Sequence, residues 1–291
     1  MAAVEFLYLV PKNALSRFVG WLVHLKLPGG LASFTITQFA KAYNINLEEA
    51  ERPVSAYASI GDFFVRRLRG DARPLGGATL VHPADSVITE SDWIKDGKII
   101  QAKGRYYSLQ DFVGTNESAK PYQGGAFATY YLCPTDYHRV HSPVSGQIVR
   151  VRHLPGHLWP VNDWSTTHIE NLFAVNERVL VEIQTDFGLM GVMFVGATNV
   201  GQISLSFWPE FRSNDPRYPS VRERVFEPSV AVTKGDELGA FHMGSTIVLL
   251  FSEEMFATLP ALKLQLPHLK GLKARVREDL LQNSKPASVP H

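Results

Sequence analysis

Hydrophobic and polar residues alternate over much of residues 78–255, and this period of two predicts β-strands. Gly, Asn and Asp separate the alternating segments at regular intervals, as turns between strands require. The segments are GKIIQAKGRYYSL, AFATYYLC, GQIVRVRHL, RVLVEIQTDF, MGVMFVGATNV, GQISLSFW, SVAVTKGDELG and STIVLLF. We therefore expect a mainly antiparallel β domain in this part of the chain.

The first 70 residues follow the longer period that is typical of helices. ALSRFVGWLVHLK places one apolar face on a helix, made of Leu15, Phe18, Val19, Leu22 and Leu25. Pro-Gly-Gly at 28–30 breaks the pattern, and SFTITQFAKAY resumes it. SIGDFFVRRLR (59–69) predicts a short amphipathic helix with Ser59 as its N-cap.

These patterns predict an α+β fold. We expect a helical region over residues 1–70, a β-rich domain over 71–281, and a loose polar tail over 282–291. GDARPLGG (70–77) marks the change from helices to strands.

The N-terminal region has two interpretations. Residues 1–43 carry four basic side chains and one acidic side chain, a local charge of 4 − 1 = +3, and the aromatic residues Phe6, Tyr8 and Trp21. No stretch reaches the roughly 18–20 apolar residues needed to span a bilayer. The helix either packs on the protein's own core or lies in a membrane interface, and the aromatic and basic residues favour the membrane. A signal peptide is not indicated, because no cleavage site follows an apolar core.

Composition narrows the choice of function. Hydrophobic residues make up 45% of the chain and charged residues 20%, which indicates a globular protein. The net charge of +1 gives no reason to expect a nucleic-acid partner. Cys133 is the single cysteine, so no internal disulfide forms and a reducing compartment fits best.

One internal similarity suggests a different protein class. HPADSVI (82–88) and SPVSGQI (142–148) each place a proline and a turn residue before a strand. A duplicated β-unit of this kind is typical of carrier modules such as lipoyl or sugar-transferase domains. That alternative predicts a stable intact chain that has no need of Ser245.

Candidate chemistry gathers at two places. LGAFHMGSTIVLLF (238–251) puts Gly244 and Ser245 at the mouth of a buried strand, where the bond between them is a candidate reaction site. A nucleophilic serine needs a base and an orienting carboxylate. CPTDYHRVHSPVSG offers His138 and His141, which face the same side in a helical turn and opposite sides in a strand.

The candidate carboxylates are Asp85, which follows Pro83 in a turn, and Asp136. Each candidate also has a structural interpretation: Asp85 caps a turn, and the histidines bind backbone carbonyls. A metal site is not expected, because HxxH lacks the Glu of HExxH and no third ligand is evident. The order Asp85, His141, Ser245 also fits a conventional hydrolase, although HMGSTIV lacks the second glycine of a nucleophile elbow.

Six segments together resemble a known family. PADSVI, QAKGRYYSL, YHRVHSPVSG, NLFAVNERV, VGATNVG and KGDELGAFHMGST occur in this order. They are similar to the phosphatidylserine decarboxylases of the bacterial and mitochondrial type, from the N-terminal helices to about residue 255. Two positions depart from the family pattern: Met243 stands where it usually has Leu, and Ser86 where it usually has Gly. Met keeps the bulk of Leu, whereas Ser86 matters if the glycine needs a positive φ.

The resemblance implies a protein that cuts itself. Ser245 would attack the Gly244 carbonyl, and elimination would leave a β chain of residues 1–244 and an α chain of residues 245–291. Ser245 would become a pyruvoyl group, the cofactor, which forms a Schiff base with the substrate amine. His141 would take the Ser245 proton, and Asp85 would hold His141. His138 would donate the later proton or position the substrate carboxylate.

The resemblance also implies the substrate and the place of action. Phosphatidylserine in a membrane would be converted to phosphatidylethanolamine and CO2. The N-terminal helices would bind an anionic membrane surface, on the cytoplasmic side of a bacterial inner membrane, as a peripheral protein. The α and β chains would stay together as a heterodimer, and two such heterodimers would form a dimer.

Overall fold

The computed structural model describes residues 11–102, 104–198, 202–242 and 244–281. Its strands are β1 (Ser86–Trp93), β2 (Lys98–Ala102), β3 (Arg105–Ser108), β4 (Ala126–Leu132), β5 (Arg139–His141), β6 (Gly146–Leu154), β7 (Arg178–Thr185), β8 (Gly188–Gly196), β9 (Ile203–Leu205), β10 (Arg222–Val232), β11 (Glu237–Phe241), β12 (Ser245–Phe251) and β13 (Lys273–Ala274). Its α-helices are α2 (Lys12–Val23), α3 (Gly29–Ala42), α4 (Ile60–Phe64), α5 (Leu109–Val113), α6 (Asn116–Ala119), α7 (Asp163–His168), α8 (Leu172–Val175), α9 (Glu253–Thr258) and α10 (Pro260–Gln265). The described residues also form the 3-10 turns η1 (Leu47–Glu49), η2 (Val54–Ala56), η3 (Lys120–Tyr122) and η4 (Leu266–His268).

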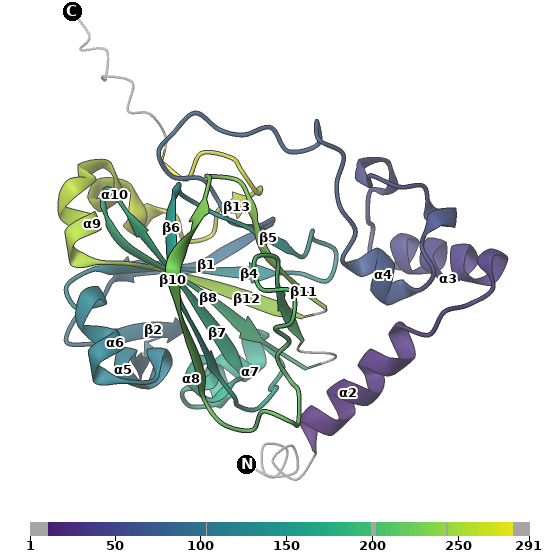
Figure 1. Ribbon diagram of the computed structural model, residues 1–291, viewed down its shortest axis with the longest axis horizontal. Helices are drawn as coiled ribbons and strands as arrows, with labels where there is room; N and C mark the ends of the chain where they lie inside the picture. Colours follow the sequence, from purple (N-terminus) through teal and green to yellow (C-terminus); the bar gives the residue numbers. More distant parts are fainter. Residues whose placement is uncertain (1–10, 103, 199–201, 243, 282–291) are drawn as a thin grey trace, which may run out of the picture.

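One large antiparallel sheet organises the fold (Figure 1). Its strand order is β10-β6-β7-β8-β12-β4-β1-β13, so β12 lies between β8 and β4 in the interior of the sheet. A three-stranded sheet, β5-β11-β9, and the hairpin β2-β3 accompany it. The predicted α+β class with a mainly antiparallel β domain is confirmed.

Both faces of the large sheet are covered, which explains the unbroken apolar run of β12. On one face Ile247, Leu249 and Phe251 join a core with the small sheet and with helices α9 and α10. On the other face Val248 and Leu250 pack into a second core, which includes residues of α5, α8 and the β2-β3 hairpin. A strand that is buried on two faces has no polar side to alternate with.

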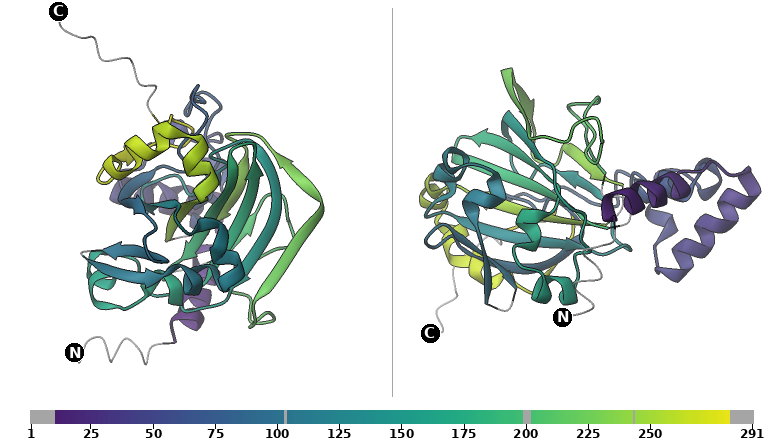
Figure 2. Two further views of the ribbon diagram at one scale, coloured as in Figure 1. Left: turned by 90° about the vertical axis from the view of Figure 1, so that its left-hand side faces the viewer. Right: turned by 90° about the horizontal axis from the view of Figure 1, so that it is seen from below.

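The structure places the N-terminal helices to one side of the sheet (Figure 2). They have a small core of their own, formed by Ile36, Ala40, Ile45, Tyr57 and Phe63. The Ser59 N-cap is confirmed, since its side chain accepts a hydrogen bond from the Asp62 amide. Helix α4 is shorter than predicted, because it ends at Phe64 and not at residue 69. The Pro-Gly-Gly segment separates α2 from α3, and Pro28 is the N-cap of α3. Proline fits there because the first residues of a helix need no amide hydrogen bond.

Helix α2 turns its apolar face outward. Lys12, Ser16 and Gly20 are its buried residues, whereas the exposed fractions are 58% for Phe18 and 61% for Trp21. Leu15, Leu22 and Leu25 are also exposed. The structure therefore does not agree with the first interpretation of this helix, in which its apolar face packs on the protein's own core. Among the described residues no helix is both long and apolar enough to cross a membrane.

Candidate active site

The Gly244–Ser245 bond lies where a turn enters β12. Ser245 is the first residue of that strand, and its backbone is in register with Leu132 of β4 and Gly196 of β8. Gly244 has φ +45°, in the left-handed region that side chains disfavour. A β-carbon on Gly244 would also lie 3.0 Å from the Thr198 carbonyl oxygen. Both the backbone conformation and the close Thr198 carbonyl therefore favour glycine at this position.

The segment that carries both histidines is extended. β5 spans Arg139–His141 and His138 comes directly before it, so the two histidines are three residues apart along extended chain, about 10 Å. Of the two geometries open from the sequence, the extended one holds, and the two side chains leave opposite sides of the strand. The histidines consequently have separate environments.

His138 lies near the start of β12 and is completely buried. Its Nε2 atom is 3.0 Å from the carbonyl oxygen of Cys133, the residue after the register partner of Ser245. Because a carbonyl only accepts, Nε2 carries the proton. The ring stacks on Phe64 with 4.2 Å between centroids. Burial lowers the pKa of His138 to about 3, so the imidazole is neutral at physiological pH.

His141 is held at both ring nitrogens. Nδ1 lies 2.8 Å from the Gly235 carbonyl oxygen, and Nε2 lies 3.1 Å from the Tyr137 hydroxyl. The carbonyl accepts from Nδ1–H, so the basic lone pair is on Nε2, where the Tyr137 hydroxyl donates. Burial lowers the pKa of His141 and keeps the ring neutral. Its backbone amide donates to the Pro83 carbonyl at 2.8 Å, close in sequence to Asp85.

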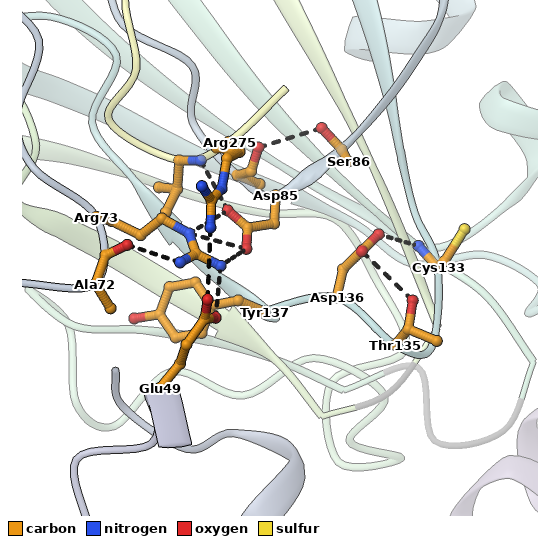
Figure 3. A network of polar contacts seen from close by, with 12 residues as sticks. Glu49, Ala72, Arg73, Asp85, Ser86, Cys133, Thr135, Asp136, Tyr137 and Arg275 are labelled. Atoms are coloured by element: carbon orange, nitrogen blue, oxygen red, sulfur yellow. Dashed lines mark hydrogen bonds and ion pairs between the residues drawn. The ribbon is translucent and has the colours of Figure 1, made fainter. Parts of the chain in front are cut away.

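Asp85 is held by an arginine that sequence reasoning did not identify (Figure 3). Arg73 Nε donates to both carboxylate oxygens at 3.1 and 3.2 Å, and Nη2 donates to Oδ2 at 2.6 Å. The Val276 amide donates to Oδ1 at 2.8 Å. We expected Asp85 to hold His141, but in the described chain the partners of its carboxylate are Arg73 and Val276. Their roles in chemistry stay predictions.

Arg73 also joins the helical region to the site. Its Nη2 atom is 2.9 Å from Glu49 Oε2, and Glu49 belongs to η1. Figure 3 shows the guanidinium between the two carboxylates. The sequence gives no signal for this contact, because Glu49, Arg73 and Asp85 lie in three separate segments. Tyr137 had a signal, since it precedes His138 in YHRVHSP.

Asp136, the other candidate carboxylate, closes the turn after β4. Its Oδ2 accepts from the Cys133 amide at 2.7 Å. Burial raises the pKa of Asp136 to about 6, against the effect of that hydrogen bond. In the structure Asp136 thus caps this turn.

The two departures from the family pattern differ in outcome. Ser86 is the first residue of strand β1, and its hydroxyl donates to the Ala84 carbonyl at 3.2 Å. An extended strand suits serine, so no glycine is needed there. Met243 lies outside the described residues, as do Phe6, Tyr8 and the predicted tail at 282–291.

A cavity of about 460 Å³ opens on the face of β12 that Thr246 occupies. Strands β1, β2 and β4 and the segment around α7 form its walls. Among the described residues no three His, Cys, Asp or Glu side chains gather as metal ligands. The structure thus brings His138 and a cavity next to the segment that begins with Ser245, whereas the contacts of His141 are with Tyr137, Gly235 and Pro83.

Together the fold and the site define an α+β protein with a constrained glycine–serine bond at the start of a buried strand. Comparison with known proteins agrees with the sequence motifs. The family model for phosphatidylserine decarboxylase matches residues 60–266, so the chain belongs to that family.

Several relatives carry the name phosphatidylserine decarboxylase proenzyme. The protein from Aliivibrio fischeri (strain MJ11) is 42% identical over 253 residues, which cover 84% of this chain and 87% of the relative. The protein from Anaeromyxobacter sp. (strain K) is 37% identical over 279 residues, 95% of this chain and 96% of the relative. The protein from Myxococcus xanthus (strain DK1622) is 38% identical over 250 residues, 85% and 88% of the two chains.

Proposed function

We propose that this chain is a proenzyme that cleaves itself at Gly244–Ser245 and then decarboxylates phosphatidylserine to phosphatidylethanolamine. The observation that carries the proposal is the constrained Gly244 before a hydroxyl residue at the start of β12. Membership of the family, whose relatives are named proenzymes, supports it over the hydrolase and the carrier module.

Maturation needs no external reagent except water. The Ser245 hydroxyl adds to the Gly244 carbonyl carbon, and the peptide C–N bond breaks to give an ester and a free amine. Loss of the Ser245 α-proton expels Gly244 as a carboxylate and leaves dehydroalanine. Its tautomer takes up water and releases ammonia, which leaves the pyruvoyl ketone at the start of the α chain. Left-handed Gly244 favours the first step, because its carbonyl must face its own neighbour.

His141 is the proposed base for that first step. Its neutral ring and its Nδ1 bond to Gly235 put the accepting lone pair on Nε2. Asp85 is the proposed carboxylate of the maturation site, and Arg73 fixes its orientation. His138 is the proposed proton donor after decarboxylation, or the group that positions the substrate carboxylate. Its contact with Cys133, one residue past the partner of Ser245, supports that role.

The pyruvoyl group fits the position of Ser245. The strand that follows is paired on both sides, which holds the new chain end in the sheet after cleavage. When present, the ketone supplies the electron sink that ordinary side chains lack, and this makes loss of CO2 from an amino acid feasible. The protein's own contribution is to bind the substrate, to exclude water and to deliver a proton.

The N-terminal helices are the proposed membrane contact. The outward apolar face of α2 and the exposed Leu31 and Phe34 of α3 offer the amphipathic surface that interfacial helices use. We further assign the protein to the cytoplasmic face of an inner membrane, as a heterodimer of its own two chains that pairs with a second heterodimer.

Two assays test the proposal. Wild-type protein should release CO2 from phosphatidylserine vesicles, and Ser245→Ala should release none; decarboxylation by Ser245→Ala would overturn the cofactor assignment. In vesicle sedimentation, Trp21→Glu with Phe18→Glu should lose binding. The matched control Leu264→Glu, at an exposed leucine of α10, should bind as wild type does. Equal binding by both variants would contradict docking through α2.

A further inference from the structure

The cavity beside Thr246 is built largely of apolar groups. Val87 and Ile88 of β1, Ala102 of β2, Val161 and Phe173 contribute to its walls. Its volume of about 460 Å³ lies in the range of small-molecule sites. It is therefore large enough to hold part of a lipid.

Two polar side chains in the cavity wall, Gln101 and Glu90, already have partners in the protein. Gln101 donates to the carbonyls of Thr166 and Ile169, both at 2.8 Å. Its own carbonyl oxygen accepts from the Leu172 amide at 2.8 Å. Glu90 accepts from Lys270 at 2.8 Å on both oxygens. A charged headgroup placed deep in this cavity would lose its hydration without replacement hydrogen bonds, which is unfavourable.

The cavity reaches Thr246, the residue after Ser245, and runs along β1. Thr246 is next to Ser245 and in register with Tyr131, which is in register with Val87. Glu90 lies three residues beyond Val87, about 10 Å along the strand. The Glu90–Lys270 ion pair thus lies at the end of the cavity away from Thr246. The Thr246 hydroxyl makes no hydrogen bond to the described residues, so at the near end it is a donor for an ester or phosphate oxygen.

We propose that this cavity receives one acyl chain of the phospholipid substrate. The inference rests on the proposed function, which places the serine headgroup at position 245. With the headgroup at position 245, an acyl chain that enters the cavity would contact the apolar walls first and the Glu90–Lys270 ion pair last. The cavity thereby makes the enzyme select for an acylated substrate by direct contact, separately from membrane docking.

Soluble substrates test the proposal without a membrane. We compare kcat/KM for monomeric dihexanoyl-phosphatidylserine and for glycerophosphoserine, which has the same headgroup and no acyl chain. Each buried methylene contributes about fourfold, so three of them give a preference of about 60-fold for the acylated substrate. A wild-type preference below about threefold would overturn the proposal. Decarboxylation of neither substrate would instead count against the proposed function.

Filling the cavity should remove the preference. Ala102→Phe places a ring in one wall, and Val161→Phe fills the same space from another wall if the first variant fails to mature. Either variant should bring the ratio of the two kcat/KM values to within about threefold of unity, because the methylene groups of the acyl chain can then no longer enter the cavity. Ala257→Phe, an exposed alanine of α9, is the matched control and should keep the wild-type ratio. A matured cavity-filled variant with the wild-type ratio would contradict the proposal.

Discussion

Replacing Arg73 by leucine should leave Asp85 as an uncompensated buried charge. The two side chains are 10% and 12% exposed, and the shortest contact between them is 2.6 Å. Asp85 would keep the Val276 amide as a partner but would lose the three contacts with the guanidinium. The change therefore probes the strongest electrostatic contact of the site.

The expected cost follows from that geometry. Breaking a buried ion pair from one side typically costs about 3–5 kcal/mol. At about 2–4 °C per kcal/mol for a domain of this size, the melting temperature should fall by roughly 6–20 °C. Arg73→Leu with Asp85→Leu should recover about 2 kcal/mol or more of this loss, because no buried charge is then left without a partner.

The assay is urea unfolding in a Ser245→Ala background, which keeps the chain whole and the unfolding transition comparable between variants. Arg52→Leu is the matched control, because Arg52 pairs with Asp62 at 3.2 Å but the two side chains are 47% and 37% exposed. That surface pair should contribute less than about 1 kcal/mol. If Arg73→Leu costs no more than Arg52→Leu, or if the double variant is less stable than Arg73→Leu alone, the reasoning is refuted.

Three further predictions concern cleavage and pH. Gly244→Ala should slow self-cleavage by about 5- to 30-fold, since left-handed backbone costs a side chain roughly 1–2 kcal/mol; a gel time course measures this, and an unchanged rate would contradict it. Tyr137→Phe removes the donor to His141 Nε2 and should slow cleavage by about 2- to 10-fold, whereas Tyr130→Phe should leave the rate unchanged. Equal cleavage rates for the two variants would contradict the role of Tyr137 in positioning His141. Stability should fall as pH drops from 6.5 toward 4, because burial lowers the pKa of His82 and His242 to about 4 and of His138 to about 3, so the unfolded chain binds more protons. Each histidine lowers the free energy of unfolding by about 1.4 kcal/mol for each pH unit of this fall. Below pH 6 Asp136, whose pKa is raised to about 6, has the opposite effect and cancels the contribution of about one histidine. Urea midpoints that stay flat or rise across this range would contradict the assignment of neutral buried histidines.

The sequence predicted most strands because period-two alternation and apolar runs reflect burial directly. GQIVRVRHL coincides with β6, and STIVLLF coincides with β12. SVAVTKGDELG was wrong as one segment, because a turn at 233–236 separates β10 from β11, with the Asp236 amide bonded to the Thr233 carbonyl at 3.0 Å. The short helices α5 to α8 were missed, since four to six residues hold less than two turns and show no helical period.

The site was predictable only where the residues are neighbours in the chain. Gly244 and Ser245 are adjacent, and the two histidines share one motif. The pairing of Asp85 with Arg73 depends on how the segment at 70–85 folds back, and the cavity depends on how β1, β2 and the α7 segment come together around it. Contacts of this kind arise from tertiary structure, which local patterns do not encode.

The most direct test of the account is intact-mass spectrometry of the denatured wild-type protein beside Ser245→Ala. We predict that wild type splits into pieces of 244 and 47 residues, from a chain of 291. The smaller piece should be about 17 Da lighter than one with a free serine terminus, as loss of ammonia requires for a pyruvoyl group, and Ser245→Ala should stay whole. An intact wild-type chain that still decarboxylates phosphatidylserine would contradict the central claim.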